Sequence, residues 1–150
     1  DVTVGGKKVC GILTEMSAEL HAIHYLVIGA GINVNIEEIP EEINQVAASL
    51  SIEAGRKLNR AKVICACMKH FERYYEKFLE TEDMSLMREQ YNAMLANMNR
   101  EVRVLEPGNE YNGIARGIND KGELLVERED GRVSNVFAGE VSVRGIYGYV

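Results

Sequence analysis

Two short apolar segments, both containing glycine, constrain the fold of this chain more than any other feature. The first covers residues 7–15, with the sequence KKVCGILTE, and the second covers residues 27–35, VIGAGINVN. Segments of this composition predict β-strands. The preceding Gly5-Gly6 pair predicts a hairpin turn, because glycine takes positive φ readily. A glycine within a strand also allows a ligand to approach the backbone closely.

The stretch after the first segment predicts a loop and then a buried strand. Residues 17–22 are mostly polar and are expected to form a loop. Residues 23–29 are almost continuously apolar, which is typical of a central strand covered on both faces. The N-terminal part therefore predicts part of a mixed sheet.

Helices are expected between the sheet and the C-terminal part. A short helix is predicted around residues 41–48, followed by a turn that ends near Gly55. Asn59 is a good N-cap for the clearest amphipathic helix, which extends to residue 80. A second helix is expected over residues 85–97. We expect these helices to cover one face of the sheet.

From residue 101 onward the apolar residues alternate with a period of two, which indicates strands. Short strands joined by tight turns over about fifty residues predict a small SH3-like barrel. The chain is thus expected to be α+β, with one domain over residues 1–99 and a second over residues 100–150. The expected strands are residues 101–105, 111–118, 123–128, 133–137 and 140–146.

Charge and cysteine content exclude several classes of protein. The net charge of −6 argues against binding to a nucleic-acid backbone, although a nucleotide needs only a local cluster of donors. No apolar run is long enough to span a membrane. The three cysteines include no CxxC pair, which favours reduced thiols in a cytoplasmic protein. His21 and His24 have no third ligand nearby, so no metal site is expected.

The Gly29-Ala30-Gly31 run must be compared with the dinucleotide fingerprint. That motif needs a third glycine and a following helix whose N-terminus faces the pyrophosphate. Here Val34 occupies the third position, and Glu37 and Glu38 follow soon after. These acids would repel a phosphate, so a nucleotide-dependent oxidoreductase is rejected.

Three further segments occur in the C-terminal part, at residues 113–118 (GIARGI), 122–126 (GELLV) and 139–144 (GEVSVR). In this order and spacing, together with the two N-terminal segments, they resemble the biotin protein ligase (biotin–acetyl-CoA-carboxylase ligase) family. The resemblance implies the C-terminal half of the catalytic domain over residues 1–99, followed by the family's SH3-like domain. Asp1 would be the last residue of the family's W-P-N-D motif, and the resemblance implies that it is one of the substrate-binding residues.

The resemblance implies a two-step reaction. Biotin and ATP form biotinyl-5′-AMP and pyrophosphate, and a lysine of a carboxylase acceptor domain then takes the biotinyl group. Mg²⁺ accompanies ATP, chiefly through phosphate oxygens. Because both reacting groups are anionic, a fixed cation is needed between them, and Lys8 matches the family lysine at this place. For Lys7, in contrast, we expect a solvent-exposed lysine whose charge discourages another chain from pairing with the edge strand.

The resemblance also implies binding roles for other residues. Gly11, Ile12 and Leu13 match the strand that lines the biotin pocket, and Gly29 and Ala30 match the opposing strand. Further matches concern the nucleotide side of the site. They are Asn33, beside the phosphate and ribose, and Glu140 and Arg144, on the small C-terminal domain.

Departures from the family pattern limit what these residues are expected to do alone. The family's arginine- and glycine-rich biotin-binding loop would lie before Asp1, and the chain contains no such run and no tryptophan. We therefore expect a piece of a longer ligase that is inactive by itself. Nucleic-acid binding is expected only if a helix-turn-helix domain precedes the ligase domain.

Three alternatives stay open. The chain could be a non-catalytic protein-interaction module, with the barrel docking a protein partner. Residues 37–42 and the segment to Gly55 could order on binding the adenylate, or could be a plain solvated connection. A truncated sheet also has an open edge, which predicts either a dimer or an aggregation-prone fragment.

Overall fold

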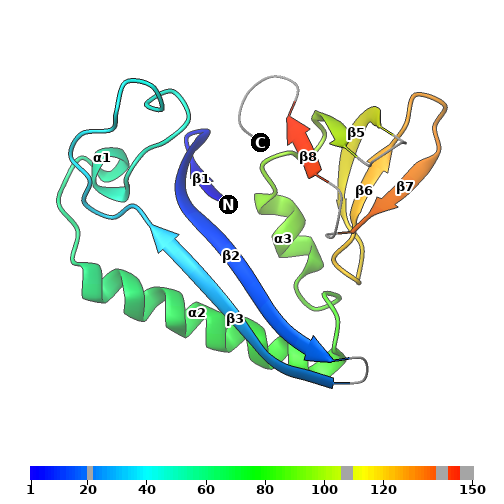
Figure 1. Ribbon diagram of the computed structural model, residues 1–150, viewed down its shortest axis with the longest axis horizontal. Coiled ribbons are helices and arrows are strands. Elements are labelled where there is room, and N and C mark those ends of the chain that lie inside the picture. The colour runs from blue at the N-terminus through cyan, green and yellow to red at the C-terminus, as the bar shows by residue number, and fades with distance from the viewer. Residues whose placement is uncertain (20–21, 106–109, 138–141, 146–150) are drawn as a thin grey trace. The chain divides into compact units, whose positions relative to one another are not determined.

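In the computed structural model, the described residues are 1–19, 22–105, 110–137 and 142–145. They form an α+β fold with three helices and two antiparallel sheets. The chain divides into two compact units, residues 1–63 and residues 64–150 (Figure 1).

The first unit contains a three-stranded sheet. Its strands are β1 (Val2–Val4), β2 (Lys7–Glu19) and β3 (Ala22–Ile32), in the order β1-β2-β3. Gly5 and Gly6 have φ of 58° and 80°, which confirms the predicted hairpin. Both strand pairings are antiparallel. The three strands thus form an antiparallel sheet instead of the expected mixed one, because hairpins join consecutive strands. A parallel contact occurs as an isolated bridge between Lys8 and Ala47.

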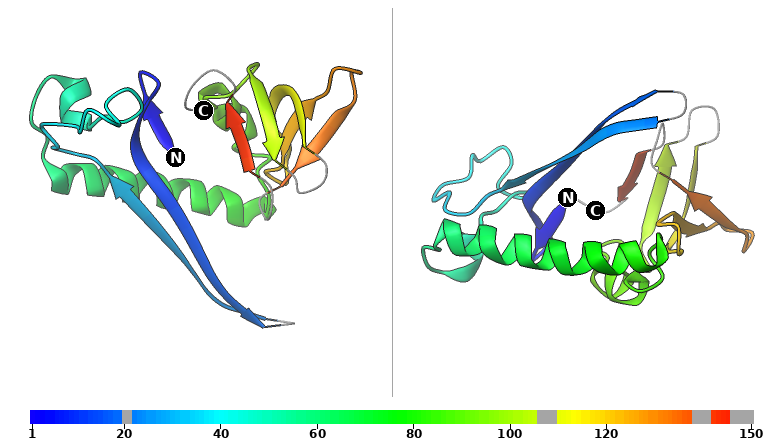
Figure 2. Two further views of the ribbon diagram at one scale, coloured as in Figure 1. Left: turned by 45° about the horizontal axis from the view of Figure 1, so that its top comes forward. Right: turned by 90° about the horizontal axis from the view of Figure 1, so that it is seen from below.

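β2 and β3 form a long two-stranded ribbon (Figure 2). Pairing continues through Ser17–Tyr25 and Glu19–Ala22, so the loop predicted over residues 17–22 is wrong at its described positions. Prediction of a strand covered on both faces is also wrong, since Ile23 is 67% exposed and Val27 is 50% exposed. The exposure arises because the described residues do not pack a layer against either face of this strand.

The segment after β3 is irregular and then helical. Residues 41–46 form turns instead of the predicted helix, because the following residues pair with Lys8 and extend the chain. The helix is α1 (Leu50–Ala54). Ser49 caps its N-terminus, and Gly55, with φ of 62°, ends it in the left-handed conformation.

The long amphipathic helix is present as α2 (Arg60–Thr81). The Asn59 side chain accepts a hydrogen bond from the Lys62 amide at 3.1 Å, which confirms the predicted cap. The next helix, α3 (Arg88–Met94), is shorter than predicted, because Leu95 takes an extended conformation at its C-terminus.

The second unit contains a five-stranded antiparallel sheet with the order β7-β6-β5-β4-β8. Its core consists of Val102, Val104, Ala115 and Val126, all essentially inaccessible to solvent. The pairings of the described residues do not form the predicted closed barrel. The strands are β4 (Glu101–Leu105), β5 (Tyr111–Ile118), β6 (Leu124–Glu127), β7 (Val133–Val136) and β8 (Ser142–Gly145).

Helix α3 is joined to β5 by the Asn92 side chain. Its amide oxygen accepts from the Ile118 amide at 2.8 Å, and its amide nitrogen donates to the Ile118 carbonyl at 3.4 Å. Gly117, with φ of 97°, lies directly beside it. A side chain there would clash, since a Cβ would lie 2.9 Å from the Asn92 amide group.

Candidate functional site

A β-bulge at the start of β2 determines where Lys8 points. Thr3 pairs with Lys8 and Val2 pairs with Cys10, so Val9 is an extra residue on β2. In a regular strand, residues three apart face opposite sides. The extra residue places Lys8 and Gly11 on the same face, which is how bulges re-aim side chains near functional sites.

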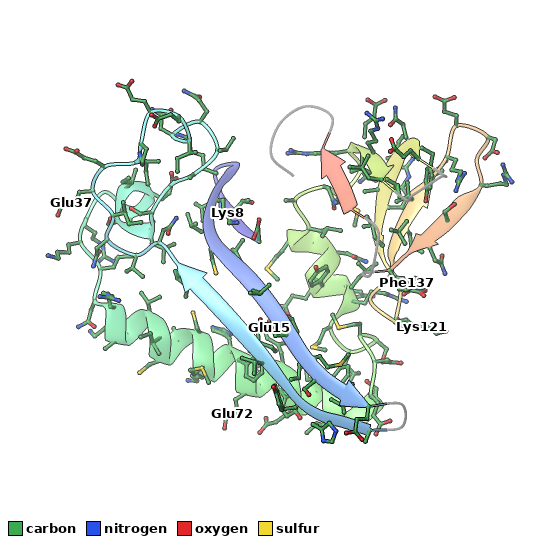
Figure 3. All side chains as sticks on the ribbon, in the orientation of Figure 1. Lys8, Glu15, Glu37, Glu72, Lys121 and Phe137 are labelled. Atoms are coloured by element: carbon green, nitrogen blue, oxygen red, sulfur yellow. The ribbon has the colours of Figure 1, made fainter. Side chains whose placement is uncertain are left out.

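The Lys8 ammonium forms an ion pair with the side chain of Asp1. Its Nζ lies 3.0 Å from Asp1 Oδ2, and the two side chains are 37% and 32% exposed. Figure 3 shows Lys8 at the start of β2, beside β1. The ammonium is therefore held by a carboxylate, on a side chain that is still partly exposed.

The backbone of Lys8 is fixed on its other side by residues 46–48. The Lys8 amide donates to the Val46 carbonyl at 2.8 Å, and the Lys8 carbonyl accepts from the Ala48 amide at 2.9 Å. Asn33 reinforces this contact, since its side-chain nitrogen donates to the Ala48 carbonyl at 3.1 Å. Asn33 is thus tied to the segment that holds Lys8.

The glycine-bearing strand lies directly opposite the predicted pocket strand. Gly11 pairs with Gly31, Ile12 with Ala30, and Leu13 with Gly29. The side chains of Ile12 and Leu13 are exposed. The structure therefore brings Asp1, Lys8, Asn33 and the paired strands β2 and β3 together in the first unit.

The space around position 29 among the described residues would also accept a residue with a side chain. A Cβ at Gly29 would meet the Leu13 carbonyl oxygen at 3.7 Å, which is ordinary van der Waals contact. Gly31 is similar, with the Gly11 carbonyl oxygen at 3.8 Å. Close packing of these two strands therefore does not explain the glycines. Their missing side chains leave space for a ligand above the sheet.

Two predicted residues belong to the second unit. Glu140 lies outside the described residues. Arg144 is on β8, where its backbone pairs with Arg103 of β4.

Residues 33–58 contribute contacts that the sequence reasoning missed. The Ser49 hydroxyl is fully buried and donates to the Ile36 carbonyl at 2.7 Å. The Asn35 side chain exchanges two hydrogen bonds of 2.9 Å with the Leu58 backbone. Ser49 and Gly55 are the available signals for this arrangement, because they are typical helix caps. Glu37 and its acidic neighbours are mainly exposed.

Histidines and acids do not assemble a metal site in the described part of the chain. No group of three or more His, Cys, Asp or Glu side chains there could hold an ion. His24 Nε2 lies 3.3 Å from Glu19 Oε1, and the other histidine of this segment, His21, lies outside the described residues. None of the described helices is long and apolar enough to cross a bilayer.

An ion-paired ammonium beside a glycine-bearing sheet defines a candidate site for an anionic ligand. Comparison with known proteins agrees with the resemblance seen in the sequence. Residues 98–144 match the biotin protein ligase C-terminal domain. The matches to curated proteins and solved structures extend this similarity over nearly the whole chain.

Two curated relatives are the bifunctional ligase/repressor BirA of Bacillus subtilis and the biotin–[acetyl-CoA-carboxylase] ligase of Mycobacterium tuberculosis. The first is 32% identical over 95% of this chain and 44% of the relative. The second is 30% identical over 94% of this chain and 50% of the relative. The chain thus spans about half the length of the curated relatives it matches.

A solved structure, the biotin protein ligase from Aquifex aeolicus in complex with biotin and ATP, is 31% identical with a TM-score of 0.82. The match covers 97% of this chain and 59% of that one. Together, the matches confirm the resemblance of this chain to the C-terminal portion of biotin protein ligases.

Proposed function

We propose that this chain is the C-terminal portion of a ligase that activates biotin with ATP and transfers it to a protein. In the first step a biotin carboxylate oxygen bonds to the α-phosphorus of ATP, and the bond to the departing pyrophosphate breaks. In the second, the ε-amine of an acceptor lysine bonds to the acyl carbon and loses a proton, and AMP leaves. The acceptor is the biotin acceptor domain of a biotin-dependent carboxylase.

The observation that carries this proposal is the position of Lys8. Its side chain is partly exposed, and its ammonium lies beside Gly11, which pairs with Gly31 of the next strand. Both substrates of the first step are anionic, so their approach is unfavourable without a compensating charge. In both steps Lys8 is the catalytic residue that stabilises charge on the carboxylate and the α-phosphate.

The other residues bind the substrates. Gly11, Ile12 and Leu13 line the biotin pocket, with Gly29 and Ala30 on the opposing strand. Asn33 lies beside the phosphate and ribose while its side-chain nitrogen holds Ala48. Glu140 and Arg144 act on the nucleotide side, Asp1 orients Lys8, and Mg²⁺ accompanies ATP through phosphate oxygens.

The finer organisation is part of the same proposal. Residues 1–99 belong to the catalytic domain and residues 100–150 to an SH3-like domain, which the family match starting at residue 98 supports. The protein is cytoplasmic, and the edge strand β3 pairs with a second copy. DNA binding belongs to the longer protein only if that protein carries a helix-turn-helix domain, as one relative's description as a repressor suggests.

A matched pair of lysine variants tests the role of Lys8. In the longer ligase, Lys8→Met is expected to lower the rate of biotinyl-AMP formation by about 10²–10³-fold, because the charge-stabilising group is removed. Lys7→Met removes the neighbouring charge and is expected to retain most of the activity. Retained adenylation by Lys8→Met, or an equal loss in both variants, contradicts the assignment.

The predicted inactivity of these residues alone has its own test. The 150-residue chain is mixed with biotin, MgATP and an acceptor domain, and transfer is followed by mass spectrometry. No transfer above the rate without protein is expected, because the sequence contains no arginine- and glycine-rich loop. Rapid, saturable biotin transfer would contradict this part of the proposal.

A further inference from the structure

Gly11 has a different steric environment from the other glycines of its sheet. A Cβ at Gly11 would lie 3.3 Å from both Cε and Nζ of Lys8 and 3.7 Å from Asp1 Oδ1. At Gly29 and Gly31 the nearest atoms are carbonyl oxygens of the paired strand at 3.7 and 3.8 Å. Gly11 is therefore the glycine of this strand pair that contacts the charged groups.

Backbone conformation does not account for glycine at this position. Gly11 does not have positive φ, unlike Gly5 and Gly6 in the preceding turn. Its neighbours on β2, Cys10 and Ile12, carry side chains in the same strand. What an alanine would add at position 11 is therefore volume, and that volume would lie against the Lys8 ammonium.

The contact exists because of the bulge at Val9. Without the extra residue, Lys8 and Gly11 would face opposite sides of the sheet. With it, the Lys8 side chain extends over Gly11 to reach Asp1 Oδ2 at 3.0 Å. A contact of 3.3 Å is tighter than a Cβ normally makes, so the flexible lysine side chain would have to move by a few tenths of an ångström.

We propose that Gly11 is a positioning residue, whose missing side chain leaves the space in which the Lys8 ammonium meets Asp1. This inference rests on the proposed function in one respect, that Lys8 is the cation that receives the anionic substrates. For Gly11 it replaces the pocket-lining role given under the proposed function, which Ile12 and Leu13 keep. A pocket residue acts on biotin affinity, whereas a positioning residue acts on the location of the lysine.

Competitive acetylation of the full chain tests the geometry without relying on ligase activity. The rate at which acetic anhydride modifies Lys8 is measured by mass spectrometry relative to Lys7, which serves as an internal standard. Gly11→Ala is expected to raise the Lys8/Lys7 ratio about two- to fivefold, the range that a partly exposed ion pair allows. The matched control Gly31→Ala, on the paired strand, is expected to leave the ratio unchanged.

A second variant removes the ion pair without adding volume. Asp1→Asn is expected to raise the ratio to a similar extent, and combining it with Gly11→Ala is expected to add little, because both changes act on one interaction. An unchanged ratio in Gly11→Ala, or full additivity in the double variant, would overturn the proposal. If Gly11→Ala does not fold, an unchanged ratio in Asp1→Asn overturns it.

Kinetics of the longer ligase separate this inference from the proposed function. Gly11→Ala is expected to lower kcat for adenylation with little change in KM for biotin. A raised KM with unchanged kcat and an unchanged acetylation ratio would return Gly11 to a pocket role and leave the proposed function intact. If Gly11→Ala changes the Lys8/Lys7 acetylation ratio but the longer protein never forms biotinyl-AMP, the positioning role of Gly11 stands and the proposed ligase function is rejected.

Discussion

The two sheets of this protein contain similar apolar residues but bury them very differently. In the five-stranded sheet, Val102 and Val126 are completely buried. In the β2–β3 ribbon, Val27 and Leu26 are about half exposed. Short strands with tight turns bring the second sheet's apolar side chains together, whereas the long ribbon needs a cover that the described residues do not supply. An apolar pattern in the sequence thus indicates that one face of a strand needs to be covered. It does not identify the segment that covers this face.

The largest expected effect concerns the glycines of the two sheets. At Gly113 of β5, a Cβ would lie 2.6 Å from both the Glu127 carbonyl oxygen and Val126 Cγ1. Gly113→Ala should therefore lower the free energy of unfolding of this sheet by about 3 kcal/mol or more, because backbone has to move. In the other sheet, Gly31→Ala should change stability little. Equal losses of stability for Gly113→Ala and Gly31→Ala in chemical denaturation would contradict the difference between the two sheets.

Truncation of a valine in each sheet sharpens the same contrast. Val126→Ala should lower the free energy of unfolding by about 2 kcal/mol, since it leaves a cavity in a closed core. Val27→Ala, at a position that is 50% exposed, should change it by less than about 0.5 kcal/mol in this chain. Denaturant titration of both variants measures the difference. A larger loss for Val27→Ala would show that the ribbon is covered in solution.

An intermediate effect is expected where α3 meets β5. Asn92→Ala removes the partner of the Ile118 amide and carbonyl. A loss of about 1–2 kcal/mol is expected, because these backbone groups lie partly buried. Amide hydrogen exchange at Ile118 should accelerate in the variant. Unchanged protection of that amide would contradict the assigned contact.

The smallest expected effect is electrostatic and lies in the turn between β6 and β7. A hydrogen bond from the Arg132 side chain lowers the pKa of Asp130 below its usual range. Because the folded-state pKa is lowered, the associated stabilisation is present at neutral pH and is lost as pH falls through the Asp130 pKa. Arg132→Gln should raise this pKa, as measured by NMR. An unchanged pKa would contradict the pairing.

Much of the fold followed from local signals in the sequence. Paired glycines determined the first hairpin, Asn59 marked the start of α2, and alternation with turn residues located β4 to β7. These signals work because the relevant interactions are made within a few residues. Helix α3 ended earlier than its apolar spacing suggests, since one extended residue, Leu95, is enough to stop it.

Features that depend on distant residues were missed. The region around Ala47 extends because it pairs with Lys8, about forty positions earlier in the sequence, and this overrides its helical pattern. The bulge at Val9 has no local signal, since it arises from the register between β1 and β2. The pairing of the strand that contains Gly11 with the strand that contains Gly29 and Gly31 is expected from the family resemblance, whereas the contacts of the Lys8 side chain with Asp1 and Gly11 are found only in the structure.

The most direct test of the central claim is a crystal structure of the longer ligase with biotinyl-5′-AMP. Lys8 Nζ is expected within about 3.2 Å of an oxygen of the acyl-phosphate group, with the biotin rings above Gly29 and Ala30. A complex in which biotinyl-AMP lies away from β2 and β3, with Lys8 contacting only Asp1, would contradict it.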